Sequence, residues 1–271
     1  MDRRPRSKPF GARIAGSEAV IPPVLCYHKI ERRRELGVTR VSPRKFAAQM
    51  HALARAGWRG IPLDEFAACV RGERPPADRA ALITFDDAYR GLRDHAFPVL
   101  RDLGFRAACF VITDYAGRLN RWDVAYGGRR FAHLTWRDIE RWQAHGIAFG
   151  SHTASHPRLP WVGDNRLRDE LARSRLALAD ALGTPPTAIA YPFGAATARE
   201  RIAASRAGYD LGFGLGSRWR GDPLHVPRHA VHCWSSRLPG IGPLAPLERA
   251  AASVAGRCAV GTSVWLHLTS A

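Results

Sequence analysis

Two adjacent carboxylates stand where an apolar, strand-like run ends. The run is 82–85, and Asp86 and Asp87 follow it directly. Two acids at the end of a buried strand are costly to place together unless a cation or a proton offsets their repulsion. Because successive residues of a regular strand point to opposite faces, both acids can serve one site only if the backbone leaves strand geometry here. The pair predicts a bound metal ion.

Two histidines lie in a loop that follows a second apolar run. His152 and His156 are four residues apart, after the run at 147–149, and this spacing permits chelation even outside a helix. One carboxylate and two imidazoles suit Zn²⁺ and leave a coordination position for water. The sequence therefore predicts one divalent metal ion, with Zn²⁺ favoured, and leaves the second carboxylate to act as a base. The alternative is a Ser- and Thr-rich turn with exposed imidazoles.

The two motifs resemble those of the polysaccharide deacetylase family, also called the NodB-homology or carbohydrate esterase 4 family. The matching stretches are 84–87 and 151–157, in this order and each after a strand. The similarity runs from about Val24 to at least Gly194. The opening stretch, 23–30, is similar to the branch of the family that deacetylates poly-N-acetylglucosamine. The resemblance implies a carbohydrate substrate with N-acetylated amino sugars.

The resemblance also implies roles for residues of this chain. The implied metal ligands are Asp87, His152 and His156. Asp86 would be the base, taking a proton from the water that attacks an amide carbonyl. The family's third motif is similar to 191–194, so we expect Tyr191 and Phe193 to contact the substrate. A backbone N–H at Phe193 would donate to the tetrahedral oxyanion.

Two positions depart from the family pattern. Relatives usually have Gly after the acid pair, where this chain has Ala88, and Ala narrows the backbone conformations available there. The Arg expected three residues before Phe193 is Ala190. Whatever orients the catalytic aspartate must therefore come from elsewhere, and Arg228 is a candidate.

A general acid must protonate the departing amine, and histidine suits that task near neutral pH. Two histidines end apolar, strand-like runs: His28 follows 24–27, and His267 follows 264–266. In the poly-N-acetylglucosamine branch the barrel looks circularly permuted, which moves the acid-bearing motif to the N-terminal strand. The resemblance therefore favours His28, and His267 is the alternative.

The repeated strand-helix order predicts an α/β fold with a mainly parallel sheet. Closure into an irregular (β/α) barrel of about seven strands, of the NodB-homology type, is favoured over an open sheet. Active sites on such barrels lie at the carboxyl ends of the strands, where both acids fall. The stretch 114–133 has neither helical nor strand periodicity and should lie over the mouth of the site. We also expect a helix at 247–255 and a last strand at 263–268.

Length and composition predict one domain. With 271 residues, 46% of them hydrophobic, the chain can bury one sizeable core. We expect residues 1–19 to form a flexible basic arm and 20–271 a single barrel domain. The formal charge of +17 comes mainly from arginines scattered through every segment. That distribution does not predict a specific nucleic-acid partner.

The expected location is the cytoplasm. The five cysteines are odd in number, have no close pairs and mostly lie in apolar segments, which indicates buried thiols in a reducing compartment. The first twenty residues are basic but hold no apolar run of seven or more, and no segment is long enough to cross a membrane. The arginines would allow peripheral contact with the inner membrane. Most relatives act on exported polymers, so this departs from what the resemblance implies.

The motifs together predict a metal-dependent hydrolase that removes N-acetyl groups from amino sugars of a poly- or oligosaccharide or a glycan precursor. One alternative is a cytosolic deformylase or cyclic-amide hydrolase on the same scaffold, which the missing leader suggests. The other alternative is a catalytically silent carbohydrate-binding relative, which Ala88 and Ala190 suggest.

Overall fold

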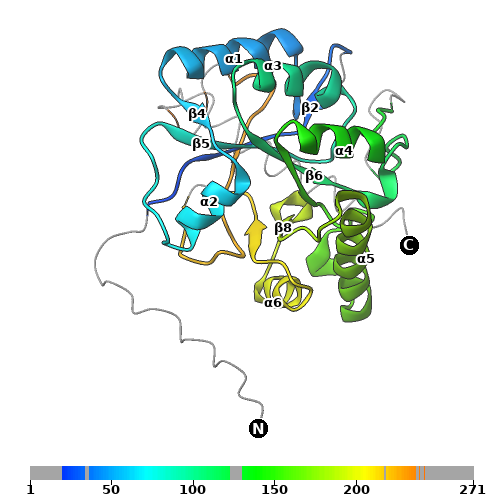
Figure 1. The fold of residues 1–271 in the computed structure, drawn as a ribbon. Helices are drawn as coiled ribbons and strands as arrows, with labels where there is room; N and C mark the ends of the chain where they lie inside the picture. The colour runs from blue at the N-terminus through cyan, green and yellow to red at the C-terminus, as the bar shows by residue number, and fades with distance from the viewer. Residues whose placement is uncertain are drawn as a thin grey trace.

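A parallel sheet of short, buried strands forms the centre of the structure (Figure 1). This computed structural model describes residues 20–33, 37–122, 130–216, 218–235, 238 and 241. The main strands are β1 (Val24–Tyr27), β5 (Ala80–Phe85), β6 (Ala107–Val111), β7 (Ile147–Ser151), β8 (Ala188–Ala190), β9 (Leu211–Phe213) and β10 (His229–Ala230). Most of their side chains are small or apolar and buried, as expected where helices cover a parallel sheet.

The strands follow the order β10-β1-β5-β6-β7-β8-β9, and their pairings are parallel. The short strand β4 (Arg59–Gly60) also pairs with the beginning of β5. The segment that leads into β10 closes the ring, because Val226 forms a parallel bridge with Phe213 of β9. The prediction of an irregular, mainly parallel barrel is confirmed, and the N-terminal strand lies beside the strand that carries the acids.

Helices surround this sheet, with α1 and α3 together in one part of Figure 1 and α5 and α6 in another. Their bounds are α1 (Pro43–Arg55), α2 (Leu63–Val70), α3 (Phe97–Asp102), α4 (Trp136–Ala144), α5 (Asp164–Leu182) and α6 (Ala198–Arg206). Two further short strands, β2 (Lys29–Ile30) and β3 (Arg40–Val41), pair with each other outside the main sheet.

Local sequence signals set the helix ends. Ser42 caps α1 through its side chain, and Thr197 opens α6 with a capping box. Gly183 ends α5 with a φ of 74°, in the left-handed region that glycine favours. Pro98 lies in the first turn of α3, directly after a π-helical turn at Leu92–Ala96, where a missing N–H interrupts no helical hydrogen bond.

Several predicted features lie outside the described residues, namely the arm at 1–19, the helix at 247–255 and the strand at 263–268. The stretch 114–133 is described only in part. Its two ends run antiparallel, since Leu119 bridges to Ala132. Within the described part of the chain, no helix combines the length and the apolar character needed to span a membrane.

Candidate metal centre and active site

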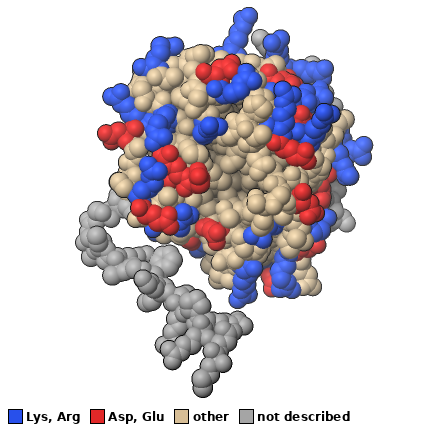
Figure 2. Space-filling model, in the orientation of Figure 1, with Lys and Arg blue, Asp and Glu red and all other residues tan. Residues whose placement is uncertain are grey.

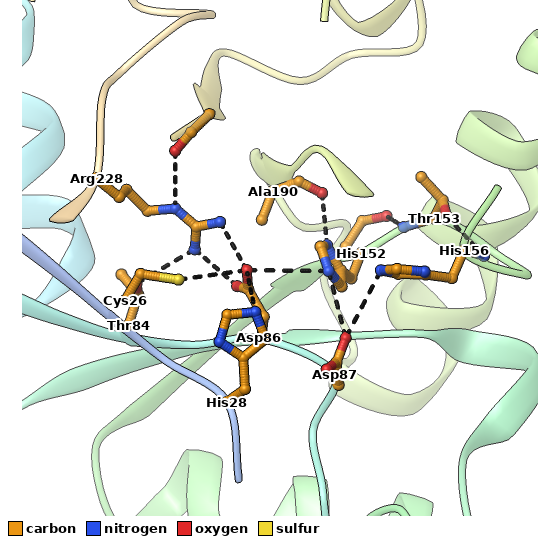
Figure 3. Close-up of polar contacts among 12 residues, drawn as sticks. Cys26, His28, Thr84, Asp86, Asp87, His152, Thr153, His156, Ala190 and Arg228 are labelled. Atoms are coloured by element: carbon orange, nitrogen blue, oxygen red, sulfur yellow. Dashed lines mark hydrogen bonds and ion pairs between the residues drawn. The ribbon is translucent and has the colours of Figure 1, made fainter. Parts of the chain in front are cut away.

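The two aspartates follow β5 at the carboxyl end of the sheet, and both are buried. The chain leaves strand geometry at this point, because Asp87 and Ala88 have φ angles of 66° and 54°. Both carboxylates consequently approach one imidazole: His152 Nε2 lies 3.5 Å from Asp87 Oδ1 and 3.9 Å from Asp86 Oδ2 (Figure 3). The expected break in the strand is therefore present, and it directs both acids to one site.

Ala88 adopts the left-handed conformation in which glycine is preferred. For a residue with a Cβ atom this conformation costs about 1–2 kcal/mol. Neighbouring contacts hold the turn in place: the Leu134 N–H donates to the Ala88 carbonyl at 2.8 Å, and His133 Nδ1 donates to the Asp87 carbonyl at 2.6 Å. The departure from the family pattern therefore does not prevent the turn that both acids need.

The loop that carries the histidines is held by a helix. Glu170 of α5 is buried and accepts hydrogen bonds from the successive N–H groups of Ala154 and Ser155, at 3.0 and 2.8 Å. Within the loop, Thr153 Oγ1 accepts from the His156 N–H at 3.1 Å. Sequence reasoning missed Glu170, although an acid among the leucines on the apolar face of a helix is a usable signal. Glu170 therefore fixes the main chain of the loop from which both histidine side chains project.

Asp87, His152 and His156 form a buried cluster whose ligand atoms all lie within 4.8 Å of one another. His152 Nδ1 donates to the Ala190 carbonyl at 2.7 Å, which leaves the Nε2 lone pair directed at Asp87. The Nε2 of His156 lies 3.7 Å from the same Asp87 oxygen. Zinc ligands at their usual bond lengths stand about 3.4 Å apart in a tetrahedron. The spacing of these three groups fits a divalent metal ion.

The protonation states of the two histidines also suit a metal ion. Burial lowers the pKa of both His152 and His156. Their imidazoles are therefore neutral near pH 7, which is the form that binds a metal.

Arg228, in the segment that leads into β10, forms a two-point contact with Asp86. Its Nη1 donates to Oδ1 and its Nη2 to Oδ2, both at 2.7 Å (Figure 3). The guanidinium is buried against the rings of Phe110 and Phe213. Burial by itself raises the pKa of Asp86, but the charge and hydrogen bonds of Arg228, together with the nearby His152 and His28, more than offset this effect and hold the pKa well below its usual range. The candidate named from the sequence thus lies where it can orient Asp86.

His28 follows β1 and lies beside Asp86. The pairing of Tyr27 with Phe85 sets this register, and His28 Nε2 lies 3.9 Å from Asp86 Oδ2. Burial lowers the pKa of His28 to about 4, so its imidazole is neutral at pH 7. His267 lies outside the described residues. The choice of His28 as the acid therefore stays a prediction, and its position beside Asp86 is compatible with it.

The two residues expected to bind substrate differ in their surroundings. Phe193 has a φ of 58°, and its ring centroid lies 4.8 Å from that of His156, so it borders the metal cluster. The Tyr191 ring is fully buried, and its hydroxyl donates to the Leu224 carbonyl at 3.0 Å. The Tyr191 side chain therefore contributes to the core, and any contact with substrate would come from its main chain. Substrate contact by either residue stays a prediction.

A tryptophan from the 114–133 stretch packs against the buried cluster of Asp87, His152 and His156. The Trp122 ring centroid lies 3.9 Å from that of His156, and Trp122 Nε1 donates to His133 Nε2 at 3.4 Å. His133 in turn donates to the Asp87 carbonyl, so the stretch is tied to both ends of the cluster. Sequence reasoning placed this stretch over the mouth of the site but did not single out Trp122 or His133.

Comparisons with known proteins agree with this arrangement. The family model described as polysaccharide deacetylase matches residues 73–212, slightly more than half of the chain. YxkH of Bacillus subtilis (strain 168), which its name places among the polysaccharide deacetylases, is 29% identical over 190 residues. That match covers 70% of this chain and 63% of YxkH, so the chain spans less than two thirds of that relative.

Two solved structures are similar over most of the chain. IcaB from Ammonifex degensii has a TM-score of 0.70 and 28% sequence identity, over 79% of this chain and 92% of that one. The Streptococcus pyogenes deacetylase PplD, solved in complex with acetate, has a TM-score of 0.70 and 24% identity, over 80% and 95% of the two chains, and shows the shared fold. With the matched motifs and the barrel both in place, the chain belongs to the polysaccharide deacetylase family.

Proposed function

We propose that this chain is a divalent-metal-dependent hydrolase that removes N-acetyl groups from amino sugars of a polysaccharide, an oligosaccharide or a glycan precursor. One observation carries the proposal: His152 lies between two carboxylates that have different partners. Asp87 faces two imidazoles, whereas Asp86 is held by a guanidinium. These are the surroundings expected of a metal ligand and of a base, respectively. Membership of the family supports the carbohydrate substrate.

The residues of the site have distinct tasks in the first step. When bound, the metal ion would supply Lewis acidity, which polarises the amide carbonyl and makes water easier to deprotonate. Asp86 accepts the proton of the attacking water as the new C–O bond forms. Arg228 keeps the Asp86 carboxylate ionised and oriented through its two hydrogen bonds. The N–H of Phe193 donates to the oxyanion.

His28 acts on the leaving nitrogen in the second step. Because its imidazole is neutral at pH 7, it must gain a proton before it can donate one. Asp86 Oδ2 lies 3.9 Å from His28 Nε2 and holds the proton taken from water. Asp86 passes this proton to His28, which protonates the amine as the C–N bond breaks. The products are acetic acid and the free amine, which exchange the remaining proton of the water to give acetate and the ammonium form of the amino sugar. The carboxylate and the imidazole return to their starting states.

A substrate panel tests the proposal. We expect the metal-loaded protein to release acetate from N-acetylated chito-oligosaccharides, with one acetyl mass lost per event in mass spectrometry. Loss of formyl from matched N-formyl substrates, without loss of acetyl, would favour the deformylase alternative. Saccharide binding without any acyl release by a fully metal-loaded sample would favour the catalytically silent alternative.

We also propose that the protein acts in the cytoplasm, with peripheral contact at the inner membrane as a second option. The described cysteines support a reducing compartment, because all four are free, with Cys26, Cys69 and Cys109 buried and Cys233 exposed. Cell fractionation tests this location. A shortened, processed N-terminus in an exported fraction would contradict it.

A further inference from the structure

A groove of about 780 Å³ adjoins the loop that carries the histidines. One wall is the stretch 114–121, the other includes Arg173 of α5, and Ser155 also lines it. Ser155 directly precedes His156, so the groove reaches to the residue next to the metal cluster. Its volume suits a small ligand or one or two sugar rings. The roles assigned above to the acids, the histidines and Arg228 make no use of this groove.

The groove carries a net positive charge. Its single acid among the lining residues, Asp114, pairs with Arg173, whose Nη2 lies 3.1 Å from the carboxylate. Arg118 and Arg121 are exposed, and neither forms an ion pair with another described residue. Both line the groove together with Tyr115. Burial raises the pKa of the Tyr115 hydroxyl, and the charges of these two arginines act to lower it. Two guanidinium groups thus remain available to an anion.

The wall that presents these arginines is ordered by main-chain hydrogen bonds. The Arg118 N–H donates to the Tyr115 carbonyl at 2.8 Å, and the Arg118 carbonyl accepts from the His133 N–H at 2.9 Å. Across the groove, Ser155 is fixed by Glu170. The Tyr115 ring and the half-exposed Leu119 side chain give the groove apolar surface, which suits the carbon face of a sugar ring.

We propose that this groove binds an acidic group, a carboxylate or a phosphate, on the saccharide whose N-acetyl group lies at the metal cluster. The inference rests on the proposed function. Guanidinium groups match the planar oxygens of carboxylates and phosphates, and Arg118 and Arg121 supply two of them on one wall. Each hydrolysis exposes a new ammonium group on the product, so a glucosamine homopolymer becomes polycationic. These arginines and the overall charge of +17 repel such a product.

The groove therefore favours an acidic heteropolysaccharide or a phosphorylated glycan precursor over a homopolymer of N-acetylglucosamine. Three oligosaccharides of equal length test this: a neutral N-acetylglucosamine oligomer, one with a neighbouring uronic acid, and one with a phosphate at its reducing end. The readouts are kcat/KM for acetate release and Kd by calorimetry, on the full chain with metal bound. We expect at least one acidic oligosaccharide to be preferred about tenfold over the neutral one. The two acidic compounds separate carboxylate from phosphate recognition.

Charge variants test whether the arginines of the groove cause the preference for acidic oligosaccharides. In the double variant Arg118→Gln/Arg121→Gln the ratio of acidic to neutral substrate should fall to about one. The matched control is Arg55→Gln/Arg206→Gln, at exposed positions of α1 and α6, which changes the net charge equally and should keep the preference and the basal activity.

Three results would overturn the inference: equal affinity of the wild-type protein for all three oligosaccharides, a preference that survives in the groove variant, or one that the control loses equally. If no oligosaccharide releases acetate, the proposed function fails. Calorimetry then tests separately whether the groove prefers acidic oligosaccharides, since binding needs no turnover.

Discussion

The guanidinium of Arg228 holds both carboxylate oxygens of Asp86 at 2.7 Å, across 142 residues of chain. The exposed fraction is 1% for Arg228 and 3% for Asp86, so water cannot replace either partner. Removing one member of such a buried pair leaves an uncompensated charge. The pair therefore couples the stability of the barrel to the ionisation of Asp86.

Replacing this arginine should affect stability and pH dependence together. We expect Arg228→Met to lower the free energy of unfolding by about 3–5 kcal/mol. Without the guanidinium, burial raises the pKa of Asp86, so the acid limb of the kcat/KM profile should move to higher pH because the base must be ionised. Arg228→Lys keeps a charge but loses the two-point contact. Its free energy of unfolding and its acid limb should lie between those of Arg228→Met and the wild type. Denaturant unfolding and pH-rate profiles measure these effects.

A partly exposed pair supplies the control for this comparison. Arg93 bonds Asp138 at 3.1 Å with its side chain about one third exposed. Arg93→Met should therefore cost about 1 kcal/mol or less and leave the acid limb in place. An unmoved acid limb in a folded Arg228→Met protein would count against Asp86 as the base.

A metal-binding assay should distinguish the roles of the two carboxylates. Asp86→Asn is expected to keep stoichiometric metal and to lose about 10²–10⁴ in activity, the usual contribution of general-base catalysis. His152→Ala should lose the metal while the barrel stays folded, because the cluster lies beyond the strand ends. The exposed His145→Ala is the control and should retain both. Metal analysis after dialysis, with circular dichroism, reports the result; loss of metal from Asp86→Asn would mean that the two aspartates have exchanged roles.

The role of His28 can be tested with leaving groups of different basicity. An acid that protonates the amine matters less when the amine leaves readily. His28→Ala should therefore lower turnover strongly on an N-acetyl amino sugar and much less on an activated aryl acetamide, whereas Asp86→Asn should be impaired on both. If His267→Ala shows this pattern and His28→Ala does not, then His267 is the general acid.

Buried neutral histidines should lower the free energy of unfolding of the metal-free protein at low pH. Burial lowers the pKa of His133 to about 4, below the value of about 6.5 in the unfolded chain. The unfolded state thus binds more protons between these values, so stability is present above pH 6.5 and is lost as pH falls towards 4. His133 alone should account for about 3 kcal/mol of this loss. Denaturant unfolding from pH 7 to pH 4 should show a shallower decline for His133→Phe than for the wild type, and equal slopes would contradict the assignment.

The sequence by itself predicted the candidate site residues and their place on the fold. Asp86, Asp87, His152 and His156 each follow a locally recognisable apolar run, and parallel strands bring their carboxyl ends to one edge of the sheet. Turn and cap signals such as Ser42 and Gly183 are also local, so the helix ends could be predicted. The resemblance of the motifs then indicated the family, which the comparisons confirmed.

Only the tertiary structure decided which distant groups support those site residues. Arg228 reaches Asp86 because the segment before β10 closes the ring between β9 and β1, and no spacing along the chain encodes that closure. Glu170 is positioned under the histidine loop by the packing of α5, and His133 by the return of the 114–133 stretch. Local patterns fix what each segment forms. Contacts between segments depend instead on strand order, register and side-chain packing, which the whole chain sets together.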